Sequence, residues 1–416
     1  MTCPPVNRLV SQSKSLFARF QQGSGTIYIN KAIVLDREAL DLCPPSHPKR
    51  PTALSQLAYH LCCRYEQLGD SNDLNEAIAF NRDALALCPP ENPDRSITLN
   101  NLAHDLSTRY NQLGGIDDLN EAIILARDAL ALRPPGHPGR SITLDNLAAR
   151  LSIRCKQLGG IDDLNEAIVL ARDALALRPP GHPDRSFTLD NLALHLSTRY
   201  DQLGGIDDLN EAIVLARDAL ALRSPGHPDW STTLNNLALH LSTRYNQLGG
   251  IDDLNEAIVL ARDSLALRPP GHPYRSITLD NLALHLSTRY DQLGGIDDLN
   301  EAIPLARDAL VLFPPGHPDR SITLNNLAKH LSVRYKQLGG IDDLNEAIVL
   351  ARDSLALRPL GQPGRSTALE DLARYLRTRF TQLGGVDDRE EPFNLYAQLQ
   401  HVSQTFSSAD LSAAKA

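Results

Sequence analysis

An asparagine recurs every 45 residues along the middle of this chain. The six copies are Asn101, Asn146, Asn191, Asn236, Asn281 and Asn326. A side-chain amide both donates and accepts hydrogen bonds, so a regular row of amides suits recognition of the backbone of an extended peptide. The residues alone leave two other interpretations open: the amides bond within the protein, or near-identical copies reflect recent duplication. Gln56 and Asp371 replace the asparagine towards the two ends.

An arginine recurs at the same interval through the whole chain. Its copies are Arg19, Arg64, Arg109, Arg154, Arg199, Arg244, Arg289, Arg334 and Arg379. By helical angle this arginine borders an apolar stripe. We therefore expect a structural tie, in which the stem packs and the guanidinium pairs with a carboxylate or a helix end. Contact with a ligand is the alternative.

Histidines and cysteines are the residue types that would hold a metal ion. One histidine series lies in a proline-rich connector and comprises His137, His182, His227, His272 and His317. Asn92 and Gln362 fill the same place elsewhere, which favours a capping or turn role. The other series comprises His195, His240, His285 and His330. Zinc ligands lie about 2.0–2.3 Å from the ion, and successive repeats should hold these histidines too far apart.

The six cysteines form no CxxC pair and no spaced Cys/His set, so we expect reduced, structural thiols. They are Cys3, Cys43, Cys62, Cys63, Cys88 and Cys155. The sequence therefore predicts no metal ion and no cofactor.

Paired carboxylates such as Asp207 and Asp208 are the remaining candidates for catalysis. Two catalytic acids need distinct environments in a closed pocket, and a repeated helix start provides neither. The sequence has no phosphate-binding glycine loop and no G-x-S-x-G motif. We expect a protein without enzymatic activity and without a small-molecule substrate.

The elements that position these residues are repeats. The sequence LGGIDDLNEAI occurs six times unchanged, and each copy starts 45 residues after the last. Repetition at a period of this size is typical of a solenoid, in which each unit contacts only its neighbours.

One copy, from His182 to Gly226, shows the first of two helical segments after Pro183, which suits a first helical position. Apolar residues follow helical spacing from Leu189 to Leu203. Gly204 suits a left-handed helix cap.

The second segment follows Asp207 and Asp208, which suit capping of its first amides. Its main apolar stripe runs from Leu209 to Leu220. Leu215 and Leu222 form a second seam that a following repeat would cover.

In this pattern the leucines and small alanines resemble the tetratricopeptide repeat, whose usual period is about 34 residues. They are Leu192, Ala193 and Leu196 in the first segment and Ala212, Ala216 and Ala219 in the second. The longer period, with LDNLA after HPDRS, resembles the repeats of kinesin light chain. Copies of RPPGHPDRS resemble arrays of large fungal proteins, where they precede a CHAT domain, a caspase-like cysteine peptidase module.

The resemblance implies an all-α, right-handed superhelical solenoid of tetratricopeptide-like hairpins whose first helices line a concave groove. In kinesin-light-chain-like arrays, Asn at the matching place clamps the backbone of an extended peptide. The tail of this sequence resembles the segment that leads towards the CHAT module. We find no Cys/His pair that would replace that peptidase.

The repeats define four regions. Residues 1–46 form a degenerate N-terminal repeat, and residues 47–361 hold seven tandem repeats of 45 residues. Residues 362–390 form a C-terminal capping half-repeat, and residues 391–416 a degenerate helix and tail. Pro304 falls inside a second segment, where other copies carry Val or Ile, so we expect a kink and the weakest joint there.

The charge of the chain indicates which classes of partner it would bind. The formal net charge is −9, spread through the repeats, which argues against nucleic acid because phosphate binding needs a basic face. No apolar run approaches the roughly 18 residues that span a bilayer, and the N-terminus lacks the apolar core of a signal peptide. We expect a cytoplasmic protein, or a nuclear one, that binds neither nucleic acid nor membrane.

The function that we favour is a protein–protein interaction scaffold that holds an extended peptide in its groove. Acidic neighbours of the asparagines, Asp145, Asp190 and Asp280, favour a basic or neutral guest. Two alternatives stay open: the sensor array of a CHAT-type peptidase system without its peptidase module, and an inert repeat expansion.

Overall fold

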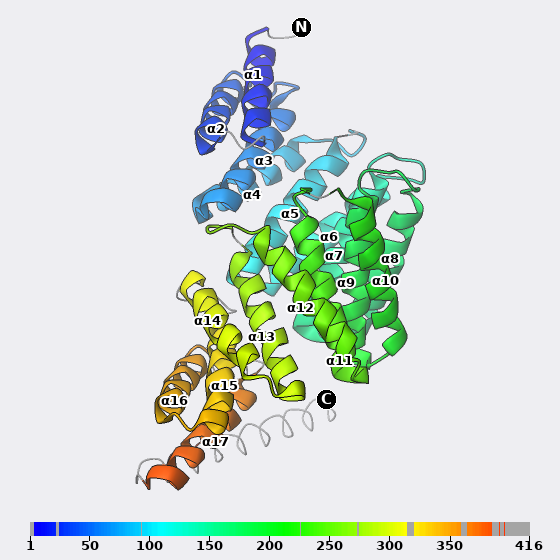
Figure 1. Ribbon diagram of the computed structural model, residues 1–416. Helices are drawn as coiled ribbons and strands as arrows, with labels where there is room; N and C mark the ends of the chain where they lie inside the picture. The colour runs from blue at the N-terminus through cyan, green and yellow to red at the C-terminus, as the bar shows by residue number, and fades with distance from the viewer. Residues whose placement is uncertain are drawn as a thin grey trace, which may run out of the picture. The chain divides into compact units, whose positions relative to one another are not determined.

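The computed structural model describes residues 4–21, 25–92, 94–224, 226–272, 274–313, 320–358, 364–384, 391 and 395. These residues form 17 α-helices joined by short turns, with no strand among them (Figure 1). The contacts divide the chain into two compact units, residues 1–222 and 223–416.

The first unit consists of five helical hairpins. Its helices are α1 (Pro4–Gln21), α2 (Thr26–Asp41), α3 (Arg50–Leu68), α4 (Ser71–Leu87), α5 (Arg95–Leu113), α6 (Ile116–Ala131), α7 (Arg140–Leu158), α8 (Ile161–Ala176), α9 (Arg185–Leu203) and α10 (Ile206–Leu222).

The second unit repeats the pattern and ends, within the described residues, on a first helix. Its helices are α11 (Trp230–Leu248), α12 (Ile251–Ala266), α13 (Arg275–Leu293), α14 (Ile296–Leu312), α15 (Arg320–Leu338), α16 (Ile341–Ala356) and α17 (Arg365–Leu383). The predicted tail and the degenerate second helix after residue 384 lie outside the described residues, except for Glu391 and Leu395.

Glycine ends each first helix from α3 to α13, as Gly204 was predicted to do after α9. Gly204 adopts φ 74° and donates its N–H to the carbonyl of Tyr200. This left-handed conformation costs glycine little because it has no Cβ. The predicted start at Pro183 is wrong, because α9 begins at Arg185, after a turn that His182 and Arg185 close.

The predicted apolar stripes are buried over most of their length. Leu189, Leu192, Ala193 and Leu196 of α9 are buried, and so are Leu209, Ala212, Ile213, Ala216 and Ala219 of α10. The stripe ends earlier than predicted, because Leu203 is 64% exposed at the end of α9. Leu215 is half-buried, but Leu222 and its counterparts Leu132 and Leu177 are exposed, so the second seam is only partly covered.

Each hairpin packs on the next through its second helix, as α8 does on α9 and α12 on α13. First helices also contact first helices, as in the pairs α3–α5, α7–α9, α11–α13 and α13–α15. Within each unit the first helices therefore form the inner, more closely packed side of the stack. The predicted all-α array of tetratricopeptide-like hairpins is confirmed; its right-handed superhelical sense stays a prediction.

The helix α14 runs without interruption through Pro304, whose side chain is exposed like that of Val259 at the same place in α12. Among the described helices, none has the length and apolar character needed for a bilayer span.

Candidate functional site on the inner face of the first helices

The asparagine row lies on successive first helices. Asn101, Asn146 and Asn191 lie on α5, α7 and α9 of the first unit, and all three are half-buried. Asn236, Asn281 and Asn326 hold the same place on α11, α13 and α15 of the second unit and are equally half-buried. Each amide therefore has part of its surface exposed to solvent.

The second unit uses two of these amides within the protein. The Nδ2 of Asn281 donates to the Oδ1 of Asn235 at 3.3 Å, and the Nδ2 of Asn326 donates to the Oδ2 of Asp280 at 3.1 Å. Both bonds join one first helix to the preceding one. The structural interpretation of the row therefore holds for these two residues.

In the first unit the amides of Asn101, Asn146 and Asn191 make no side-chain hydrogen bond to other described residues. The residue one turn before each is a large apolar side chain: Ile97, Ile142 and Phe187 are 48%, 48% and 46% exposed. Exposed apolar surface therefore lies next to these amides. Such a face suits binding of a peptide, because amides can hydrogen-bond to its backbone and apolar surface can bury its side chains.

Of the three acidic neighbours of the asparagines, Asp145 does not contribute to the exposed face. Asp145 is 1% exposed, and its Oδ2 accepts hydrogen bonds from the Nη1 of Arg178 and, at 3.0 Å, from the Oγ1 of Thr188. Asp280 is half-buried and accepts the amide of Asn326. The expectation of a basic or neutral guest loses the support of Asp145, which faces the packed interior, whereas Asp190 and Asp280 are half-buried.

Arg178, which contacts Asp145, belongs to a recurring set of buried arginines that was not predicted to have a role. Arg133, Arg178, Arg223, Arg268 and Arg358 follow the second helices and are all buried. They contact the next first helix: the Nη1 of Arg133, for example, donates to the carbonyl of Gly139 at 2.9 Å. The signal in the sequence was an arginine at a fixed place before the proline-rich connector.

The other recurring arginine forms the predicted tie to a carboxylate in seven hairpins. Its guanidinium binds both carboxylate oxygens of the aspartate at the third position of the second helix in its own hairpin, which follows another aspartate in every such pair except the one with Asp73. Seven such pairs, at 2.6–2.7 Å, are Arg64–Asp73, Arg109–Asp118, Arg154–Asp163, Arg199–Asp208, Arg244–Asp253, Arg289–Asp298 and Arg334–Asp343. These pairs raise the arginine pKa, through the hydrogen bond first of all, as for Arg199.

The same arginine also reaches the preceding hairpin. The Nη1 of Arg154 donates to the Oδ1 of Asn120 at 3.1 Å, and Arg199 contacts Asn165 in the same way at 3.2 Å. The predicted capping by the aspartates is wrong at the repeated starts, because the N-cap is a glycine such as Gly160, with no side-chain hydrogen bond. The second aspartate serves the arginine instead.

The connector histidines have the predicted turn role. The Nδ1 of His137 accepts the N–H of Gly139 at 3.0 Å, and His182 accepts that of Asp184 at 3.2 Å. Asn92 does the same with its Oδ1. His317 and Gln362 lie outside the described residues.

The other histidine series is buried in the first helices. Burial lowers the pKa of His195, His240, His285 and His330 to about 4, so these side chains are neutral at neutral pH. Both ring nitrogens of His195, His285 and His330 lack a hydrogen-bond partner. Such rings behave as core side chains whose charged form is strongly disfavoured.

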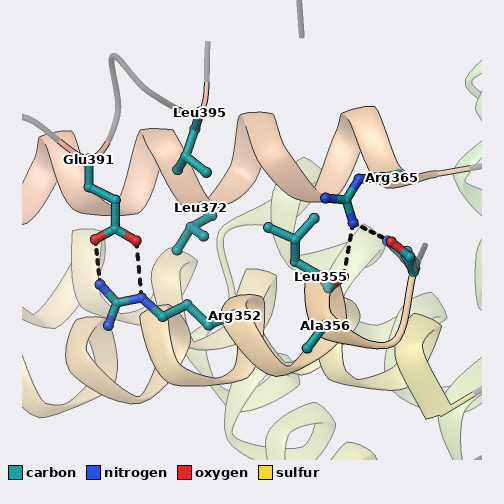
Figure 2. A pocket seen from close by; sticks show the side chains of 8 residues that line it. Arg352, Leu355, Ala356, Arg365, Leu372, Glu391 and Leu395 are labelled. Carbon is teal, nitrogen blue, oxygen red and sulfur yellow. Dashed lines mark hydrogen bonds and ion pairs between the residues drawn. The ribbon is translucent and has the colours of Figure 1, made fainter. Parts of the chain in front are cut away.

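Pockets also recur on the other side of the stack. Figure 2 shows one of about 470 Å³, where Arg352 pairs with Glu391 at 2.5 Å beside Leu355, Leu372 and Leu395. Its counterpart in the first unit, about 530 Å³, has Arg172 and Glu211 in the same places. Because the pocket follows the repeat, it is a product of stacking rather than a single specialised site.

Comparison with known proteins identifies structures with a similar fold. No family model and no curated protein matches the sequence. Solved structures do: a monomeric IFIT1 mutant with Gppp-AAAA superposes with a TM-score of 0.58 at 14% identity, over 96% of this chain and 80% of that one. The human IFIT1 dimer with PPP-AAAA gives 0.53 at 15% identity, over 85% and 70%.

A putative kinesin light chain of Podosopora anserina, with nearly identical TPR-like repeats, gives a TM-score of 0.39 at 20% identity, over 53% of this chain and 97% of that one. The likeness to IFIT1 supports an all-α array of stacked helical hairpins. At these identities the likeness describes the fold alone.

Proposed function

We propose that this protein is a non-enzymatic interaction scaffold of the cytoplasm that binds an extended segment of a partner protein along the inner face of α5, α7 and α9. The observation that carries the proposal is the row of Asn101, Asn146 and Asn191. Each of these residues is half-buried, and its amide makes no side-chain hydrogen bond to other described residues.

The neighbouring side chains define the guest. Ile97, Ile142 and Phe187 offer apolar surface one turn from the amides. A segment with apolar side chains at intervals, and its backbone N–H and C=O groups free, complements this face. With Asp145 buried, the charge of the guest is not constrained by that carboxylate.

Nucleic acid is the competing guest, because IFIT1 was solved with Gppp-AAAA and PPP-AAAA. Phosphate recognition needs Lys or Arg. The inward positions on α9 are Phe187, Asn191, Leu194 and Thr198, and the equivalent positions on α5 and α7 also carry neither Lys nor Arg. This composition favours a peptide.

The test selects 12-residue peptides from a displayed random library on the full chain and measures the affinity of the best one by calorimetry. The triple variant N101A/N146A/N191A should bind about a hundredfold more weakly, since each lost hydrogen-bonding amide costs about 0.5–1.5 kcal/mol. The matched control I124A/V169A/V214A, on exposed side chains of the second helices, should bind like wild type.

Unchanged affinity in the triple asparagine variant, with helicity intact, would move the site elsewhere. Tight binding of oligoadenylate in place of any peptide would replace the proposal with RNA recognition. Failure to select a peptide would favour a sensor array of a CHAT-type system or an inert expansion.

A further inference from the structure

Three side chains with metal-ligating atoms meet between α3 and α5 of the first unit. The Sγ of Cys62, a carboxylate oxygen of Glu66 and a ring nitrogen of His104 all lie within 4.8 Å of one another. The Nε2 of His104 is 3.2 Å from the Oε1 of Glu66. Cys62 and Glu66 are one helical turn apart on α3, and His104 faces them from α5.

The surroundings of these atoms favour a cation. Cys62 is buried, whereas the side chains of Glu66 and His104 are about half exposed. The buried carboxylate of Asp105 accepts the Nδ2 of Asn81 at 2.8 Å and lies next to the thiol. Burial, reinforced by the charge and hydrogen bond of Asp105 and by Glu66, holds the pKa of the Cys62 thiol well above its usual range.

The equivalent positions in the other repeats can be compared with these three residues. Ser replaces Cys62 in the following hairpins, at Ser107, Ser152, Ser197, Ser242, Ser287 and Ser332. Asn111 replaces Glu66, and Ala149 replaces His104, in the next pair of first helices. Cys62 departs from the serine that these six later copies share, whereas the places of Glu66 and His104 vary from copy to copy, as at Lys156 and Leu194. Among the described residues, this is the one group of three such ligands whose atoms lie within 4.8 Å of one another.

The three ligand types belong to one kind of site. Thiolate, imidazole and carboxylate all bind Zn²⁺, at about 2.0–2.3 Å. Glu66 and His104 are exposed and free to move the short distance needed, while Cys62 is fixed in the packed helix. On binding, the thiol proton leaves to solvent and sulfur bonds to the metal; water completes the coordination.

We propose that Cys62, Glu66 and His104 form a binding site for one Zn²⁺ ion on the inner face of the first unit. The sequence predicted no metal ion, because no spacing motif joins these residues. The metal test does not depend on the peptide proposal, because none of the three asparagines supplies a ligand, although His104 lies one turn after Asn101 on α5.

The test titrates Co²⁺ and then Zn²⁺ into the tag-free, metal-stripped full chain. We expect one equivalent of Co²⁺ to produce the near-ultraviolet sulfur-to-cobalt charge-transfer band and the visible bands of a four-coordinate ion, and Zn²⁺ to abolish both. C62S, E66N and H104A restore residues that the array itself carries at these places. C62S should lose the charge-transfer band, and all three should bind Zn²⁺ at least about a hundredfold more weakly, the upper end of what even outer-shell losses cost.

The control is C63S, which removes the adjacent thiol on α3 and should bind like wild type. A charge-transfer band that persists in C62S, or that disappears in C63S, would overturn the assignment of sulfur. No band in wild type, or Zn²⁺ affinity unchanged in E66N and H104A, would overturn the site.

Discussion

At the scale of single residues, the buried pair of Arg178 and Asp145 shows how this protein handles interior charge. Burial raises the pKa of the Asp145 carboxyl more than Arg178 and Thr188 lower it. A buried ion pair of this kind adds little net stability over apolar packing, but removing one partner leaves a charge uncompensated.

We therefore expect D145A to lower the free energy of unfolding by about 3–5 kcal/mol. D145N should cost clearly less, because asparagine occupies this place at Asn100 and Asn235 and retains a hydrogen-bond acceptor for Thr188. Urea unfolding followed by circular dichroism measures both. Equal losses for the two variants would show that Arg178 requires the charge of Asp145 and that a neutral hydrogen-bond acceptor does not replace it.

At the scale of elements, α14 is the helix that breaks a local rule. Pro304 is the ninth residue of a 17-residue helix and has no N–H to donate to the carbonyl of Asn300. Packing holds the helix together, because Ala302, Ile303 and Ala306 on either side are buried. The kink stays a prediction, and a local loss of stability follows from the missing hydrogen bond.

P304V should slow amide exchange in α14 and stabilise it by up to about 3 kcal/mol. The reverse change, V259P, at the matching place in α12, should speed exchange there by a similar factor. Hydrogen exchange with mass spectrometry compares the two helices. Exchange in wild-type α14 as slow as in α12 would contradict the prediction.

At the scale of the whole molecule, the buried histidines whose pKa burial lowers are unevenly shared between the two units. His195 lies in the first unit, while His240, His285 and His330 lie in the second. Their folded pKa of about 4 is below the ordinary value of about 6.5, so the unfolded chain binds more protons between these pH values. Their contribution to stability is therefore full above about pH 6.5 and falls as the pH drops towards 4.

Each such histidine contributes about 1.4 kcal/mol per pH unit in that window. We expect the second unit to lose stability faster than the first between pH 6.5 and 4.5. Trp230, the single tryptophan, reports on the second unit by fluorescence, while circular dichroism reports on both. The variant H240Q/H285Q/H330Q should flatten the pH dependence of the fluorescence transition, and H195Q should leave it as in wild type. A slope unchanged by the triple variant would rule out these residues as the cause.

Much of the fold could be predicted because the same helical pattern recurs in every repeat. Helical spacing from Leu189 to Leu196, Gly204 after the first helix and the 45-residue period predicted hairpins and their stacking, and all are present. The tie between Arg199 and a carboxylate was also predicted, since an arginine beside an apolar stripe needs a partner.

The candidate site was only half predictable. The sequence placed the six asparagines on one face, but it did not distinguish Asn191, which has no internal partner, from Asn326, which bonds to Asp280. It placed Asp145 in the groove, although that residue is buried against Arg178. Both outcomes depend on which side chain of the neighbouring hairpin comes within hydrogen-bonding distance.

The sequence by itself determined the structure of one repeat. Each repeat has two amphipathic helices, a glycine turn and a proline-rich connector, all set by interactions within a few residues. Only the tertiary structure decided which residues of different repeats meet. Cys62 and His104 are brought together from separate hairpins, as are Arg178 and Asp145. Local periodicity fixes the direction of a side chain on its helix, but the stacking of one hairpin on the next fixes its partner.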